Sequence, residues 1–71
     1  MNTNQLEWFC LAYETRSFAK AAENAFVSRQ ALGKALRSLE GELGAQLFER
    51  SETGVVPTAA AEAAYPIASR M

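Results

Sequence analysis

Apolar residues recur at helical spacing in two stretches of the chain. The first stretch places four of them on one face of a helix near the N-terminus: Leu6, Phe9, Cys10 and Tyr13. The second has leucines at positions 32, 36, 39 and 43, at intervals of four, three and four. Ser28 can cap the start of this second helix, and Gly44 supplies a typical C-terminal stop. The pattern therefore predicts one helix from about Leu6 and a longer one over about 28–42.

A short helix is predicted between these two. Ser17 can cap its N-terminus, and the helix then runs from Phe18 to about Asn24, with alanines at positions 19, 21 and 22. Such small side chains let another helix approach closely. The turn "AFV" leads from this short helix into the longer one.

The stretch "QLFERSETGVVPT" has a different pattern, because two short apolar runs flank "SETG". Gly54 can adopt a positive φ and close a turn, so we expect a small β-hairpin. Pro57 has no N–H to donate, and its strand should therefore be short or lie at an edge.

A fourth helix is predicted to begin after Thr58 and to run towards the C-terminus, with Glu62 near its positive end. Pro66 lies inside it and should bend or weaken it, since an interior proline costs about 3 kcal/mol. One stripe of this helix is apolar: Ala60, Ala64, Ile67 and Met71. The stripe suits either a seam with a second helix or packing on its own domain.

Length and composition limit the functions that the chain can have. Its 71 residues make at most one small, mainly α domain, and Cys10 cannot form an internal disulfide. The chain has no histidine, so the usual zinc and general-base arrangements are not available, and we expect no metal and no cofactor. Glu40 and Glu42 point to different sides of a helix, so paired-carboxylate catalysis fits poorly and no enzyme is expected. With no run of roughly 20 apolar residues, we expect a cytoplasmic protein without a membrane segment.

Positive charge is concentrated in the middle of the chain, although the net charge is −1. Residues 16–37 carry +4, whereas residues 1–15 carry −2 and residues 38–71 carry −3. An acidic total therefore conceals a basic block that contains most of the longer helix.

The outer face of the longer helix carries the candidate chemistry. Because its leucines form the inner face, the opposite face presents Arg29, Gln30, Gly33, Lys34 and Arg37. Arginine and lysine donate to phosphates and guanine edges, glutamine pairs with adenine, and glycine lets a partner approach the backbone. The capped N-terminus also favours a phosphate. This face suits the major groove of DNA, although many basic helix faces are simply solvated.

The neighbouring elements favour a DNA-binding function. A short helix, a turn and a longer basic helix make a helix-turn-helix, and a hairpin after it would be a wing. The stretch "SFAKAAENAFVSRQALGKALRSLEGELGAQLFER", followed by "GVVPTAAAEA", resembles the N-terminal winged helix-turn-helix domain of LysR-type transcriptional regulators. The similarity extends from Leu6 to about Ala64.

The resemblance implies sequence-specific binding to double-stranded promoter DNA, with helix 28–42 in the major groove and the hairpin near the minor groove. It implies a DNA-binding domain over residues 1–58 and the start of a linker helix over residues 59–71. That linker would make a homodimer or tetramer. A small-molecule effector would act only through a further domain that is absent from this chain.

The chain departs from the family pattern at the positions that would face DNA. Arg29 stands where the family usually has glutamine, and Gly33 stands where it usually has a polar serine. In the hairpin, Thr53 and Val56 are uncharged and Glu52 is acidic, so contacts there should be weak. Together with the acidic total charge, this leaves an alternative, a winged-helix protein-interaction module with weak or lost DNA binding.

We assign roles to seven candidate DNA-binding residues: Ser28, Arg29, Gln30, Gly33, Lys34, Arg37 and Arg50. Arg29 and Gln30 at the helix start, together with Lys34, should read base edges, because N-terminal recognition-helix residues lie deepest in the groove. Arg37 should meet a phosphate, and Ser28 both caps the helix and donates to phosphate. Arg50 is a second phosphate candidate or the partner of a nearby glutamate. Glu40 should be structural and pair with an arginine.

Overall fold

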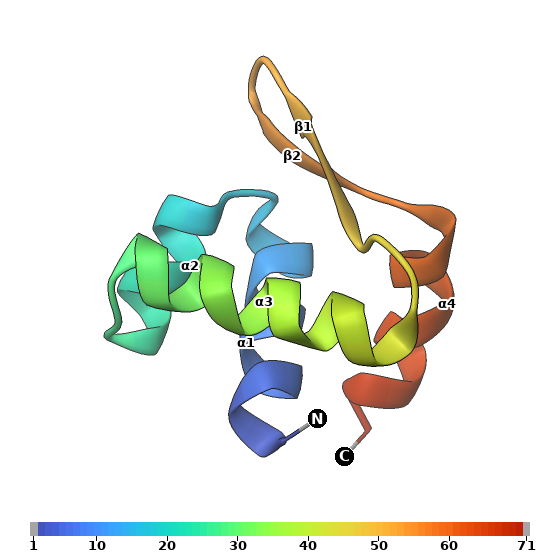
Figure 1. Cartoon of the computed structure of the whole chain (residues 1–71). Coiled ribbons are helices and arrows are strands. Elements are labelled where there is room, and N and C mark those ends of the chain that lie inside the picture. The colour runs from blue at the N-terminus through green and yellow to red at the C-terminus, as the bar shows by residue number, and fades with distance from the viewer. Residues whose placement is uncertain (1, 71) are drawn as a thin grey trace.

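The computed structural model describes residues 2–70, and within them four helices and one hairpin make up the fold (Figure 1), as the hydrophobic pattern predicts. The elements are, in order, α1 (Thr3–Thr15), α2 (Phe18–Ala25), α3 (Arg29–Leu43), β1 (Phe48–Ser51), β2 (Gly54–Pro57) and α4 (Ala59–Ala68). The turn between α2 and α3 reverses at Phe26, which has a left-handed backbone with φ of 59°. The helix-turn-helix pair and the wing predicted from the sequence are therefore both present.

Each helix begins at a residue whose side-chain oxygen caps it. Ser17, Ser28 and Thr58 do so at the three positions that the sequence predicts. For α1 the sequence analysis missed the cap. The Asn2 side chain accepts from the Gln5 N–H at 2.8 Å, and the Gln5 side chain accepts from the Asn2 N–H at 3.2 Å. This reciprocal capping box starts α1 at Thr3, one turn earlier than expected.

The leucines of α3 form the centre of the core, together with residues of α1 and the wing. The largest fully buried side chains are Phe9, Leu32, Leu39 and Leu47. The stripe ends sooner than expected, because Leu43 is 42% exposed. It lines an apolar groove together with residues of α1, α3 and α4.

Two hydrogen bonds attach the wing to the helices. Within β2, the N–H of Val55 donates to the carbonyl of Arg16, the residue that ends α1, at 3.2 Å. At the base of the wing, the N–H of Leu47 donates to the Glu40 carboxylate at 2.7 Å. Glu40 is thus structural as expected, but it binds a backbone N–H instead of an arginine.

The helix α4 lies on α1 and is joined to it by two tyrosines. The rings of Tyr13 and Tyr65 are stacked, with centroids 4.0 Å apart. Tyr13 donates to the Glu62 carboxylate, and Tyr65 donates to the Glu14 carboxylate, so the two hydrogen bonds cross between the helices. This Tyr–Glu clasp fixes the direction in which α4 leaves the domain.

Part of the apolar stripe of α4 packs on its own domain. The helix continues through Pro66 to Ala68, so this proline does not end it. Ala60 and Ala64 are half-buried against the core, whereas Ile67 is 68% exposed. Met71 lies outside the described residues. Own-domain packing thus accounts for the two alanines, and a seam with a second helix stays a prediction for Ile67.

Replacing Gly54 with alanine should detach the wing. Gly54 has φ of 145°, and a Cβ there would lie 2.4 Å from the carbonyl oxygen of Arg16. We expect Gly54→Ala to lower the free energy of unfolding by about 1–3 kcal/mol, measured by chemical denaturation followed by circular dichroism. The matched control is Gly41→Ala on α3, where a Cβ meets nothing within 4 Å. That change should raise stability by roughly 0.5–1 kcal/mol. Equal effects of the two changes would contradict the close approach.

The clasp also predicts late titration of the tyrosines. The hydrogen bond to Glu14 is the main cause that raises the pKa of Tyr65 to about 12, and the one to Glu62 raises the pKa of Tyr13 above its ordinary value. Because the folded state holds these protons more tightly, the clasp stabilises the fold below the ordinary tyrosine pKa. That stabilisation is lost as the pH rises from there towards 12. An ultraviolet titration of tyrosinate should show one transition near 12 that Glu14→Gln moves towards the ordinary value. Ordinary titration of both tyrosines in the parent would exclude the clasp.

Candidate nucleic-acid interface

The outer face of α3 is polar because its leucines are turned into the core. With Leu32, Leu36 and Leu39 buried, the opposite side presents exposed polar residues: Ser28, Arg29, Gln30, Lys34 and Arg37. Ser28 accepts from the Ala31 N–H at 3.0 Å, which leaves other first-turn amides of α3 open to an external acceptor. The predicted face therefore exists, and it begins at the positive end of the helix dipole.

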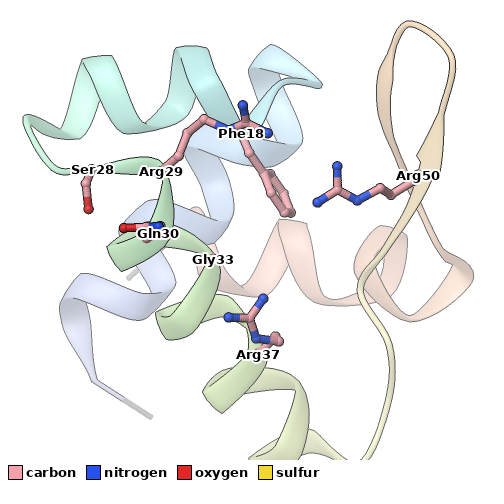
Figure 2. A pocket seen from close by; sticks show the side chains of 7 residues that line it. All are labelled: Phe18, Ser28, Arg29, Gln30, Gly33, Arg37 and Arg50. Atoms are coloured by element: carbon pink, nitrogen blue, oxygen red, sulfur yellow. The ribbon is translucent and has the colours of Figure 1, made fainter.

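This face is hollowed where α3 meets the wing (Figure 2). The hollow has a volume of about 560 Å³ and receives residues from the start of α2, from α3 and from β1. Its lining consists of Phe18, Ser28, Arg29, Gln30, Gly33, Arg37 and Arg50. Six of the seven predicted residues thus come together in one place. The seventh, Lys34, is exposed on α3 but does not line the hollow.

All the charged residues of the hollow are arginines. In Figure 2, Arg50 extends from the wing towards the ring of Phe18, Arg29 extends from the start of α3 towards α2, and Arg37 lies along α3 near Gly33; all three line the hollow. Among residues 2–70, none of these three guanidinium groups has an ion-pair partner. The glutamate partner that the sequence left open for Arg50 is therefore not found in the described part. Three unpaired guanidinium groups around one acid-free hollow favour a ligand with several anionic or acceptor oxygens.

Gly33 is buried, whereas the sequence predicts that its backbone is exposed to a partner. The guanidinium of Arg37 lies over it, with Nη1 3.7 Å from the place that a Cβ would occupy. The glycine thus provides room for a neighbouring side chain on this face.

Phe18 is a lining residue that the sequence analysis missed. Its half-buried ring packs edge-on against the ring of Phe48 in β1, with centroids 5.5 Å apart. It therefore connects the hollow to the core. The sequence marks Phe18 only as the first residue of a helix, because its contact with Phe48 joins residues thirty positions apart.

Other kinds of site find little support in the described part of the chain. Residues 2–70 contain no group of three metal-ligating side chains. Burial, and then the carboxylates of Glu14 and Glu7, raise the pKa of the Cys10 thiol, so it stays protonated at neutral pH and is a poor nucleophile. Over the same residues, no helix is long and apolar enough to cross a membrane.

Comparison with known proteins identifies the class to which this helix-turn-helix belongs. The model for the bacterial regulatory helix-turn-helix proteins of the lysR family matches residues 3–62. The chain therefore belongs to the LysR family. The HTH-type transcriptional regulator HdfR of Escherichia coli O139:H28 is 35% identical over 71 residues. Those residues are all of this chain and 25% of HdfR.

Solved structures of LysR-family proteins have the same fold. The DNA-binding domain of CbnR in complex with DNA has a TM-score of 0.94 at 36% identity, over 99% of this chain and 80% of that one. The DNA-binding domain of BenM with catB site 1 DNA has a TM-score of 0.92 at 33% identity, over 99% and 79%. Full-length CbnR in complex with its target DNA has a TM-score of 0.93 at 36% identity, and the chain covers 24% of it. The winged helix-turn-helix fold predicted from the sequence is thereby confirmed.

Proposed function

We propose that this chain binds double-stranded DNA sequence-specifically, as the DNA-binding domain of a bacterial LysR-type transcriptional regulator. The observation that carries the proposal is the hollow in which Arg29, Arg37 and Arg50 gather without an ion-pair partner among residues 2–70. The similar domains of CbnR and BenM, each solved with DNA, support it.

In this proposal α3 lies in the major groove. Arg29 and Gln30 stand in its first turn, where a recognition helix lies deepest, and both carry donors suited to base edges. Ser28 and the amides of that first turn would meet a phosphate. Arg50 comes from the wing, on the other wall of the hollow, and would reach the backbone of the neighbouring strand.

The rest of the regulator follows from the family. Residues 59–71 would begin a linker helix, and two copies joined through it would place two recognition helices on one promoter site. The exposed Ile67 is available for that seam. We propose a homodimer or tetramer that acts in the cytoplasm and responds to a small-molecule effector bound outside residues 1–71.

The distribution of charge favours DNA over a protein partner. The lining of the hollow contains no acidic residue, although Glu49 stands beside Arg50 in β1 and Glu52 lies in the turn of the wing. Positive charge is thus concentrated in the hollow, and the net charge of −1 comes from carboxylates outside its lining. The alternative, an interaction module with lost DNA binding, does not account for the arginine cluster in the hollow. This alternative predicts that the chain does not bind duplex DNA.

Salt dependence tests the proposal. In a fluorescence-anisotropy titration with duplex DNA, affinity should fall with rising salt by about 0.9 in log–log slope for each phosphate neutralised. Arg50→Ala should weaken binding to every duplex and reduce that slope by about 1. The matched control is Arg70→Ala, which removes the same charge from an exposed residue just beyond α4.

Three results would contradict the proposal or its placement. Binding by a folded chain that does not respond to salt would exclude phosphate contacts. A folded chain that binds no duplex would support the interaction module. Equal losses for Arg50→Ala and Arg70→Ala would mean that DNA contacts another face.

A further inference from the structure

The side chain of Arg37 does not lie where its place in the helix suggests. Arg37 stands in the third turn of α3, away from the helix start, which is why the sequence indicates a phosphate contact for it. Its Nη1 nevertheless lies 3.7 Å from the position of a Cβ on Gly33, one turn nearer the N-terminus. Figure 2 shows this guanidinium close to the turn of α3 that carries Gly33.

The cause is the direction of side chains on a helix combined with an empty position. Helical side chains lean towards the N-terminus, and residues four apart lie one above the other on the same face. At position 33 no side chain occupies that place, since the residue is glycine. The long Arg37 side chain therefore lies back along the groove-facing side and brings its charge to the level of residue 33.

The residues around this guanidinium leave its donors available. Glu40, one turn further on, accepts from the Leu47 N–H at 2.7 Å and forms no ion pair with Arg37. Arg37 also lines a second hollow of about 210 Å³, which shares Phe18, Gly33 and Arg50 with the first and whose lining includes Glu40 and Glu49. Arg37 thus borders both hollows, and it has no ion-pair partner among residues 2–70.

We propose that Arg37 reads a guanine edge in the major groove, and that Gly33 is the specificity-determining residue that positions it. Arginine pairs bidentately with O6 and N7 of guanine, and a guanidinium held at the middle of α3 faces base edges more directly than the flanking phosphates. The DNA half-site should therefore contain a G·C pair opposite the turn formed by residues 33–37. This inference rests on the proposed function.

The test is a selection of bound duplexes from a random library, made with the 71-residue chain and with single variants. The parent should enrich a motif that contains a guanine at one position, and the preference for that guanine should depend on Arg37. Arg37→Gln should reduce the preference for that guanine by roughly 5- to 150-fold, the range expected for one bidentate pair, and leave the other positions of the motif unchanged. A phosphate contact would instead lower binding to all sequences alike.

Two substitutions at position 33 test whether the guanine preference needs the space that Gly33 leaves for the Arg37 guanidinium. Gly33→Ala places a Cβ at ordinary contact distance from Nη1, so the guanine preference should survive. Gly33→Leu fills the place of the guanidinium and should reduce preference at the same base pair as Arg37→Gln. Adding Arg37→Gln to Gly33→Leu should then change that position little further.

The outcomes distinguish this inference from the proposed function. If the folded parent enriches no duplex, the proposed function fails and the inference fails with it. If the parent enriches a motif but Arg37→Gln weakens all sequences equally, Arg37 is a phosphate contact and only the inference is overturned. If Arg37→Gln removes the guanine preference but Gly33→Leu preserves it, the role of Gly33 is wrong.

Discussion

Burial of the α3 leucines is the constraint on which the rest of the structure depends. Leu32, Leu36 and Leu39 are almost wholly removed from water, and burying such a side chain is worth roughly 1.5–3 kcal/mol. This fixes the rotation of α3 about its axis, because turning the helix would expose these side chains together. The same rotation turns the polar face outwards. The core therefore decides which residues can meet a partner, and no separate device is needed to present them.

The wing adds the second wall of the hollow, and two backbone contacts hold it in place. The Val55 N–H binds the carbonyl of Arg16, and the Leu47 N–H binds Glu40, so the hairpin is tied both to the corner after α1 and to α3 itself. Arg50 is brought opposite α3 in this way. A two-stranded hairpin is marginally stable alone, so its position depends on these attachments. The Tyr–Glu clasp does the equivalent for α4, which it holds on α1.

Most of the fold could be predicted because it rests on local signals. Leucine spacing, the capping residues at 17, 28 and 58, and the turn closed by Gly54 each act within a few residues. Five of the predicted site residues line one hollow for the same reason, because they lie on one face of α3 and its N-cap, whereas Arg50 reaches it only through the contacts that hold the wing. Most of what escaped prediction joins distant segments: Phe18 against Phe48, and the crossed bonds of the two tyrosines. The Asn2–Gln5 capping box, which was also missed, is a local exception. The burial of Gly33 was also missed, because it depends on the conformation of the Arg37 side chain. The exposure of Leu43 was missed because it depends on how closely α4 approaches.

The central claim is that the arginine-lined hollow between α3 and the wing is the surface that binds DNA. Backbone amide NMR of the chain, recorded while duplex DNA is added, tests it most directly because it reports every element at once. We predict that the amides that shift are those of the first half of α3 and of β1 around Arg50, while those of α1 around Glu7 and of α4 stay unchanged. Shifts confined to the α1 and α4 side, with α3 unaffected, would contradict the account.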